Sequence, residues 1–261
     1  SIPEQKKIAS IFTSVEKMIK STQKQINKLQ DLKKAMINEL LIKGIGHKEF
    51  KDSELGRIPK SWEIRSLGDI VSCLGGYAFK SEDECDDGVR WLKIANVGVG
   101  QIKWNDESFL PKHFSQKHAD FILKEDDIVC AMTRPILNGK LKVATISKLD
   151  EGALLNQRVC KIKPNKYILS KFLFLILQSE DFVNQLDLAI AGSDPPNVSG
   201  KQIEALRIAL PSASEQKVIS NAVYAIQKRI DCVFKKLIQT QSLKKSLMQV
   251  LLTGKVRVKI N

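Results

Sequence analysis

Residues 3–41, PEQKKIASIFTSVEKMIKSTQKQINKLQDLKKAMINELL, recur without a gap near the other end of the chain as residues 214–252, SEQKVISNAVYAIQKRIDCVFKKLIQTQSLKKSLMQVLL. The two copies are offset by 211 residues. Both begin their alignment with Glu-Gln-Lys, at Glu4 and Glu215. A long stretch repeated so far along the chain predicts two structural elements of the same kind.

Apolar residues recur in both copies at alternating steps of four and three, which is the spacing of a coiled-coil seam. Neither copy has Pro or Gly in its interior, and Gly44 and Gly254 follow the last leucines, where helices commonly end. We therefore predict two helices of about 38 residues, roughly 57 Å long. The predicted seam and partner-binding residues are Ile8, Phe12, Val15, Ile19, Ile26 and Leu29 in the first copy, and Ile219, Val223, Ile226, Ile230, Val233 and Leu237 in the second.

Both copies also place a lysine, Lys33 or Lys244, where the seam expects an apolar residue. A polar residue at a seam position costs stability and tends to fix the register of the helices. The alternative, which we favour at this point, is that the lysine stem lies along the seam while its ammonium group reaches water.

The segment between the two copies is long enough for a globular domain of its own. Its predicted strands lie at 54–70, 89–104, 126–132, 141–146 and 156–164, with a helix at 168–190, capped by Ser170, and a helix-to-strand segment at 199–210. This pattern predicts an α+β fold in which a mixed-sheet domain is inserted between two long helices that form an antiparallel coiled coil. We predict domains at 1–46, 47–210 and 211–261.

Charge is distributed unevenly along the chain. The formal net charge is +13, and the excess lies in the two repeated segments, because residues 45–210 carry 23 basic and 23 acidic side chains. Such an excess suggests a nucleic-acid or acidic protein partner, although a solvated coiled-coil surface is the plainer explanation. No apolar run approaches the roughly 20 residues of a membrane span. Scattered cysteines without a CxxC pair suggest reduced thiols and a cytoplasmic location.

The stretch GSDPPN, residues 192–197, resembles the catalytic Asp-Pro-Pro loop of amino-methyltransferases, whose following aromatic residue stacks on a flipped base. Here Asn197 takes the aromatic position, and no glycine-rich turn leads from a strand into a helix to hold S-adenosylmethionine. Clustered metal ligands and a Ser-His-Asp or Cys-His arrangement are also missing from the pattern. We therefore predict a chain without catalytic residues, metal or cofactor, in which 192–197 is a polar turn that either contacts DNA or caps the helix after Ser199.

Within the central segment, basic residues dominate from 128 to 179, which fits contact with phosphates on one face. The stretch MTRPILNGKLK, residues 132–142, is interpreted as a polar loop that could bring Arg and Asn to base edges, where they pair with guanine and adenine. The predicted DNA-binding residues are Lys80, Arg90, Lys93, Arg134, Asn138, Lys140, Lys142, Arg158, Ser193 and Asn197.

Several stretches together resemble one family, the DNA-specificity subunit of type I restriction–modification enzymes. LGRIPKSWEIRSLGDI (55–70) resembles the start of its target recognition domain, and GGYAFKSEDE with GVRWLKIANVGVGQI (75–102) the segment that follows. DDIVCAMTR (126–134) and LNQRVCKIKP (155–164) resemble its central strands. GSDPPNVSGKQIEALRIALPSASEQKVI (192–219) resembles its passage into a conserved helix, and the repeated helices resemble its spacer regions.

This resemblance implies a non-catalytic reader of one half of a split double-stranded DNA target. The helices would dock modification subunits, which carry S-adenosylmethionine and the methyl-transfer site, and restriction subunits would join through them. A member of the family normally has two recognition domains, so the chain resembles either a half-subunit able to form a homodimer or, as we favour, part of a longer subunit. The alternatives are a coiled-coil scaffold whose globule binds protein and, less favoured, an intrinsic methyltransferase.

Overall fold

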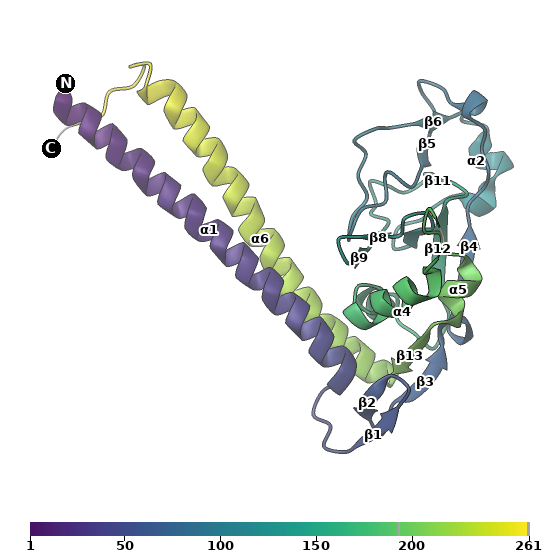
Figure 1. Ribbon diagram of the computed structural model, residues 1–261. Helices are drawn as coiled ribbons and strands as arrows, with labels where there is room; N and C mark the ends of the chain where they lie inside the picture. Colours follow the sequence, from purple (N-terminus) through teal and green to yellow (C-terminus); the bar gives the residue numbers. More distant parts are fainter. Residues whose placement is uncertain (193, 260–261) are drawn as a thin grey trace. The chain divides into compact units, whose positions relative to one another are not determined.

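The computed structural model describes residues 1–192 and 194–259. Within it the chain forms two compact units. The helical unit consists of Ser1–Ile37 and Asn221–Asn261, and the globular unit of Asn38–Ser220. Long helices near both chain ends flank a domain that contains the β-sheets, which confirms the predicted α+β class (Figure 1). The predicted domain boundaries differ from these units, which divide each long helix, and they stay predictions.

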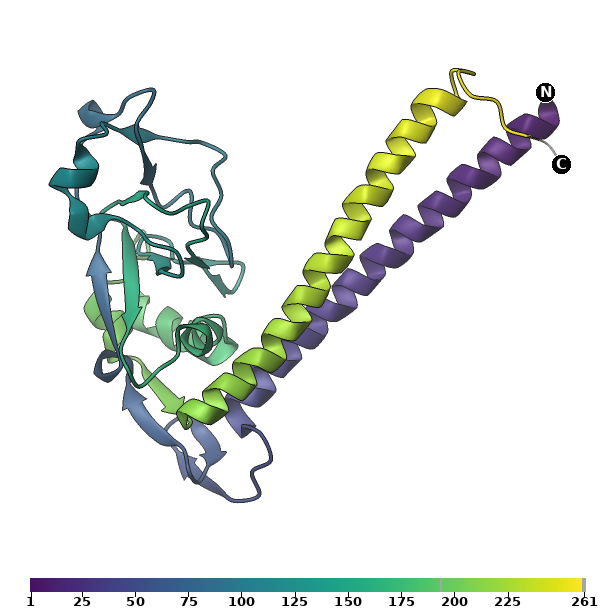
Figure 2. The ribbon, with the colours of Figure 1, turned by 180° about the vertical axis from the view of Figure 1, so that it is seen from behind.

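Two long helices run antiparallel in the helical unit. Helix α1 spans Ile2–Lys43 and α6 spans Ala213–Leu251, which gives them 42 and 39 residues. They lie side by side in both views, with the beginning of α1 and the end of α6 at the same end of the pair (Figures 1 and 2). An apolar cluster joins them, made of buried Ile26, Ile230, Val233 and Leu237 with Ile19, Leu29 and Ile226 packed against it.

The two seam lysines each form a hydrogen bond across the helix pair. Lys33 Nζ donates to Gln227 Oε1 at 2.8 Å, and Lys244 Nζ donates to Glu16 Oε1 at 2.9 Å. Gln227 stands at the repeat position of Glu16, so the same two positions are joined twice, once through a neutral amide and once as an ion pair. The interpretation that their ammonium groups reach water stays a prediction, and the two bonds across the pair support a role in fixing the register.

The other predicted seam residues lie in different environments. Ile8, Phe12 and Val15 of α1 are only half-buried, whereas Val223 of α6 is fully buried. Ile219 belongs to the globular unit and is fully buried there. The two copies of the seam pattern thus do not have the same surroundings along their whole length.

A polar contact closes the chain-end side of the helix pair. Glu4, in the first turn of α1, accepts hydrogen bonds from Arg257 Nε at 2.7 Å and Arg257 Nη2 at 2.8 Å. The Val258 N–H donates to the same carboxylate at 3.3 Å. The hydrogen bond from Arg257 is the main reason that the pKa of Glu4 is lowered to about 2. The segment that follows α6 is therefore bound to the beginning of α1.

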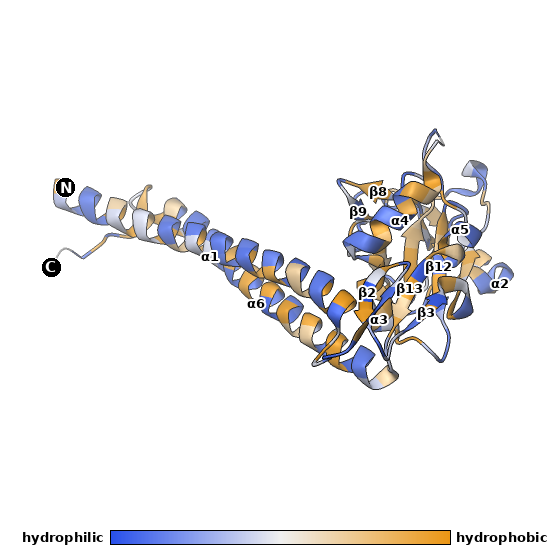
Figure 3. Cartoon of the chain, turned by 60° about the horizontal axis from the view of Figure 1, so that its bottom comes forward, coloured by the Kyte–Doolittle hydropathy of each residue, from blue (hydrophilic) through white to orange (hydrophobic). Residues whose placement is uncertain are grey.

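The globular unit is built around an antiparallel four-stranded sheet in the order β10-β7-β12-β4. Of the two middle strands, β7 is fully buried, and β12 buries Val159, Cys160 and Ile162, whereas its two lysines are not buried (β12 in Figure 3). The four strands correspond to predicted strand segments or lie beside them: β4 Val71–Gly75, β7 Ile128–Ala131, β10 Val143–Thr145 and β12 Val159–Pro164.

Further strands form smaller sheets in which β5 and β11 are parallel and the other pairs antiparallel. The pairs are β1 Phe50–Ser53 with β2 Gly56–Pro59, β3 Glu63–Ser66 with β13 Arg207–Leu210, β5 Val89–Leu92 with both β6 Phe109–Leu110 and β11 Leu154–Leu155, and β8 Ile136–Leu137 with β9 Lys140–Leu141. Short helices connect the strands: η1 Leu67–Asp69, η2 Ser81–Asp83, α2 Phe114–Lys117, η3 Ala119–Phe121 and α5 Gly200–Ala205.

The helix predicted at 168–190 is two helices in the structure. Helix α3 spans Ser170–Leu177 and α4 spans Glu180–Ile190. Ser179 begins the second helix, because its hydroxyl accepts a hydrogen bond from the Phe182 N–H at 3.2 Å. The predicted cap at Ser170 is therefore wrong, since that residue is the first of α3 and Leu169 precedes it as the cap.

Glu215, in the first turn of α6, anchors the chain that leaves α1. Its Oε1 accepts from the Ile45 N–H at 3.0 Å and lies 2.7 Å from His47 Nε2, and its Oε2 accepts from Trp62 Nε1 at 3.0 Å. Gly44 has a φ of 63°, and a Cβ there would collide with Glu215, His47 and Trp62. This turn therefore requires glycine, as the sequence pattern predicts for the end of α1.

Candidate nucleic-acid interface

Four segments meet at one end of the four-stranded sheet, and together they are called the loop edge: residues 75–77, 131–134, 155–158 and 196–198. Main-chain hydrogen bonds join them: Tyr77 N–H to the Leu155 carbonyl at 2.9 Å, Met132 N–H to Arg158 at 2.9 Å, Val198 N–H to Met132 at 2.8 Å and Arg134 N–H to Pro196 at 2.7 Å. Because these bonds hold all four backbones, the loop edge offers its side chains a rigid support.

The hairpin β8–β9 extends the loop edge beyond Arg134. Leu137 pairs with Lys140, and the two residues between them, Asn138 and Gly139, have φ values of 51° and 69°. Positive φ at both central residues is typical of a type I′ turn, for which Asn-Gly is a preferred sequence. The stretch interpreted as a polar loop is therefore a two-stranded ribbon with a tight turn at its tip.

Arg134 occupies an unusual backbone conformation. Its φ is 46°, a left-handed value that costs a residue with a side chain on the order of 1 kcal/mol. The bond from its N–H to Pro196 and the adjacent β-bridge between Thr133 and Asn197 hold it there. Such strain persists where neighbouring structure over-determines a residue, and it gathers at binding sites. The exposed side chain of Arg134 is thus presented from a fixed backbone.

Half of the predicted DNA-binding residues lie on the loop edge or its hairpin: Arg134, Asn138, Lys140, Arg158 and Asn197. The side chains of Arg134, Lys140 and Arg158 are exposed. Within the described part of the chain, none of these three forms an ion pair. No carboxylate among the described residues of the globular unit therefore neutralises their charges.

Arg90 and Lys93, on and after β5, have acidic partners instead. Arg90 Nη2 lies 2.9 Å from Glu107 Oε1, and its guanidinium lies over the Trp104 ring at 5.1 Å. Lys93 Nζ lies 3.1 Å from Glu84 Oε2 and donates to the Ser108 hydroxyl at 2.8 Å. These contacts give both residues a structural role, and their assignment to DNA stays a prediction.

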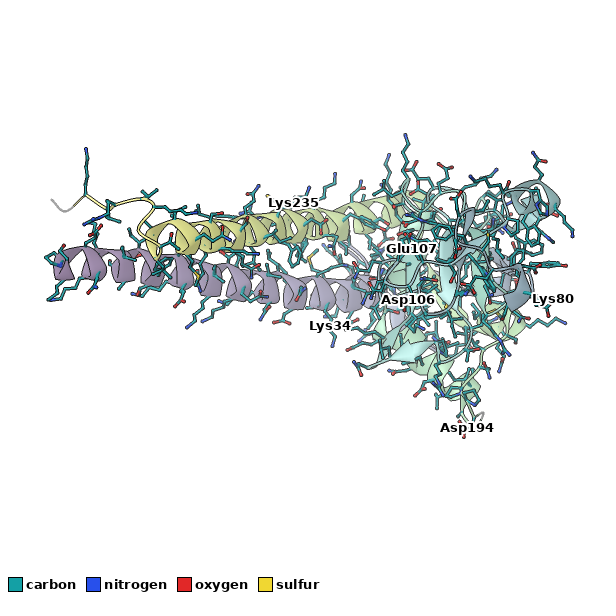
Figure 4. The ribbon with its side chains drawn as sticks, turned by 90° about the horizontal axis from the view of Figure 1, so that it is seen from above. Lys34, Lys80, Asp106, Glu107, Asp194 and Lys235 are labelled. Atoms are coloured by element: carbon teal, nitrogen blue, oxygen red, sulfur yellow. The ribbon has the colours of Figure 1, made fainter. Side chains whose placement is uncertain are left out.

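Lys142 and Lys80 also lie away from the hairpin tip. Lys142 Nζ donates to the Ile94 carbonyl at 3.0 Å, and burial lowers the pKa of its ammonium group. Lys80 precedes η2, is exposed and lies at a different edge of the globular unit from Asp194 (Figure 4). The structure therefore does not bring all ten predicted residues together.

The turn at 192–197 is partly described. Ser193 lies outside the described residues. Asn197 Nδ2 donates to the Pro195 carbonyl at 2.8 Å, and residue 197 bridges Thr133. Helix α5 is capped by Ser199, whose hydroxyl accepts from the Gln202 N–H at 3.2 Å. The hypothesis that the turn caps this helix is therefore wrong, and the turn instead supports the backbone of the loop edge.

Two residues of this site were missed from the sequence. Tyr77 is 42% exposed, and its ring packs against His118 at 4.2 Å between centroids. Leu137 is 52% exposed on the hairpin beside Asn138. The signals were present in the sequence as a Gly-Gly pair before Tyr77 and an Asn-Gly pair after Leu137, because both pairs are typical of turns that present a neighbouring side chain.

The helical unit presents a second surface on which the repeat is visible. Leu32 and Leu243, which are equivalent in the two copies, are 49% and 54% exposed. Lysines lie on the outer faces of both helices, including Lys34 and Lys235 (Figure 4). Each helix therefore carries an exposed leucine at the same position of the repeat.

The described residues contain neither a group of metal ligands nor a membrane-spanning helix. Among residues 1–192 and 194–259, no three His, Cys, Asp or Glu side chains gather as metal ligands would. In the same part of the chain, no helix is long and apolar enough to cross a membrane.

The known proteins to which the chain is similar are specificity subunits of type I restriction enzymes. A family model for the type I restriction modification DNA specificity domain matches residues 59–243. The type I restriction enzyme MjaVIII specificity subunit of Methanocaldococcus jannaschii is 40% identical over 260 residues, which are 99% of this chain and 61% of that protein. The EcoAI specificity subunit of Escherichia coli is 38% identical over 188 residues, 70% of this chain and 32% of that protein.

Solved structures of specificity subunits share the fold. The HsdS subunit from Thermoanaerobacter tengcongensis superposes with a TM-score of 0.58 at 13% identity, covering 96% of this chain and 57% of that one. The type I S subunit from M. genitalium gives 0.60 at 15% identity, covering 99% and 62%. The chain thus spans about three fifths of the length of these structures. On the match of the family model and the 40% identity, it belongs to the DNA-specificity subunits of type I restriction–modification systems.

Proposed function

We propose that the chain reads one half of a split double-stranded DNA target and is itself non-catalytic. The observation that carries this proposal is the loop edge, where exposed Arg134, Lys140 and Arg158 lie on a hydrogen-bonded backbone. Phosphate contacts from such cations supply affinity, whereas base contacts supply sequence selectivity. Arginine suits guanine and asparagine suits adenine, so Arg134 and Asn138 are the first candidates for base reading.

Retention of a randomised duplex pool at several salt concentrations tests this role. We expect the triple variant Arg134→Ala, Lys140→Ala and Arg158→Ala to bind at least tenfold more weakly at moderate salt. The salt dependence should also become shallower, by about one unit of slope for each cation that no longer neutralises a phosphate.

The matched control is Lys112→Ala, since Lys112 is exposed but ion-paired with Asp87 at 2.9 Å. It should leave both affinity and slope unchanged. If the wild-type chain retains no duplex at low salt, alone or with a modification subunit present, the DNA-reading role is wrong.

We further propose that the helical unit docks modification subunits, which would carry S-adenosylmethionine and the methyl-transfer site, with restriction subunits joining through them. The exposed leucines Leu32 and Leu243 support this role, because equivalent apolar positions in an antiparallel pair offer two copies of one partner the same surface. A second copy of this chain is the alternative partner.

Co-purification with a modification subunit tests the docking role. Ile19→Asp or Ile230→Asp places a carboxylate in the seam and should abolish complex formation while the globular unit stays folded. Leu32→Asp combined with Leu243→Asp should weaken the complex without separating the helices, and unchanged complex formation in both experiments would contradict the proposal. Methyl transfer from tritiated S-adenosylmethionine by the purified chain alone would show that it is an enzyme after all.

A further inference from the structure

The tip of the β8–β9 hairpin combines features that the DNA-reading role does not require. Leu137 is 52% exposed there, so it gains only part of the hydrophobic stabilisation that burial of a whole leucine gives. Single exposed leucines are common on proteins, and Leu149 and Leu188, 85% and 79% exposed, are examples in this chain. Exposure alone therefore does not assign a role to Leu137, and any role has to be argued from the residues around it.

The surroundings of Leu137 differ from those of the other two leucines. It precedes the type I′ turn at Asn138 and Gly139, and it pairs with Lys140 across the ribbon. At the base of the ribbon, the Lys142 N–H donates to the Pro135 carbonyl at 2.7 Å, and Arg134 is held by Pro196. An apolar side chain is thus held at a rigid tip among polar and cationic groups, and residues 132–142 contain no acidic residue.

These features match the major groove of DNA. A two-stranded β-ribbon fits into that groove, with cations reaching the phosphates on either side. Leucine can neither donate nor accept a hydrogen bond, so it cannot read the polar pattern of a base edge. The one apolar group that a base presents in the major groove is the C5 methyl of thymine.

We propose that the β8–β9 ribbon enters the major groove and that Leu137 reads a thymine by contact with its C5 methyl group. This inference rests on the proposed DNA-reading function and adds a specificity-determining residue to it. The type I′ turn fixes the tip, Lys140 holds the ribbon against the DNA phosphates, and Leu137 selects a methyl-bearing base beside those that Arg134 and Asn138 read.

Replacement of thymine by deoxyuridine tests the contact, since deoxyuridine lacks only the C5 methyl and keeps its base pairing. The duplex most enriched from a randomised pool by the wild-type chain is prepared with either base. We expect the wild-type chain to bind the deoxyuridine duplex about fourfold more weakly, the effect of removing one buried methyl group. Leu137→Ala should bind the thymine duplex more weakly by a similar factor and should bind both duplexes equally.

The matched control is Leu149→Ala, which removes a more exposed leucine outside the hairpin and should keep the full deoxyuridine penalty. Equal thermal unfolding of the variants shows that the fold is intact. The inference is overturned if Leu137→Ala keeps the wild-type penalty, or if the enriched half-site contains no thymine on either strand. If the triple variant of the loop edge loses affinity while Leu137→Ala behaves as wild type, only this inference fails, whereas loss of all duplex retention by the wild-type chain removes the proposed function itself.

Discussion

The first turns of α1 and α6 share the stretch Glu-Gln-Lys, which begins at Glu4 and at Glu215, but this stretch has different surroundings in the two helices. Glu4 and Glu215 both accept hydrogen bonds from a main-chain N–H and a side chain of the segment that follows the other helix. Glu215 also accepts from the indole of Trp62, and Gln216 beside it is 1% exposed, whereas Gln5 is exposed. A repeated motif can therefore keep its bonding pattern while its contribution to stability depends on what packs over it.

The largest expected difference between the two copies is at the first seam position. Ile219 is 0% exposed in the globular unit, and its repeat equivalent Ile8 is half-buried. Ile219→Asp should therefore unfold the globular unit or lower its stability by about 4 kcal/mol, because a carboxylate would replace a fully buried side chain. Ile8→Asp should leave the urea midpoint of that unit unchanged. Equal shifts for the two variants would mean that the copies have equivalent surroundings after all.

The second difference concerns the glutamates themselves. Glu215→Ala leaves the Ile45 N–H, His47 and the Trp62 indole without their shared acceptor, at a cost of about 3 kcal/mol. Urea unfolding followed by tryptophan fluorescence measures this change. Glu4→Ala should not shift that transition, and it should instead increase hydrogen exchange in the first turns of α1 and at residues 254–258. A fluorescence midpoint that moves for Glu4→Ala would contradict the distinction.

The seam lysines are a position at which the two copies of the repeat should have similar effects on stability. Lys33→Ala and Lys244→Ala each remove one cross-helix bond, at 2.8 and 2.9 Å, and each should cost the helical unit about 1 kcal/mol. A double mutant of Lys33 with Gln227 should show coupling of similar size to one of Lys244 with Glu16. If only one of the two pairs showed coupling, the two cross-helix bonds would not contribute equally to the stability of the helix pair.

The smallest effect is the pH dependence of the contact between Glu4 and Arg257. Because the folded pKa of Glu4 is lowered to about 2 from 4.5, the contact stabilises the folded state above pH 4.5 and loses its contribution as the pH falls from there towards 2. Hydrogen exchange of the Val258 N–H across this range measures the loss. Glu4→Gln should abolish the dependence, and a profile that persists in Glu4→Gln would assign it to another group.

The sequence predicted the long-range organisation better than the local details. The 4-3 spacing of apolar residues identified both helices, because burial along a seam imposes that period on the sequence directly. The break between α3 and α4 was missed, since the apolar run is continuous through Leu177 and only the cap at Ser179 marks the second helix. A local hydrogen bond of this kind leaves little trace in a hydrophobic pattern.

For the candidate site, the sequence indicates which types of residue are present better than it indicates where they lie. The basic character of 132–142 was visible, but its folding as a ribbon depends on two positive φ values at Asn138 and Gly139. The sequence alone does not distinguish Arg90 from Arg134. In the structure, Arg90 is paired with Glu107, whereas Arg134 is exposed and has no ion pair within the described residues. Only the tertiary structure separates a cation that is already neutralised from one that remains available.

The two lysine bonds relate the helices by a local symmetry. Lys33 bonds to Gln227, and its repeat equivalent Lys244 bonds to Glu16, the repeat equivalent of Gln227. Reciprocity of this kind, in which position i of one copy meets position j of the other and j meets i, is the geometry of a two-fold symmetric homodimer. At these two bonds the helices of one chain are therefore related as two subunits of such a dimer are, and a partner that recognises one bonded pair meets the same pair of positions again on the other side of the local axis.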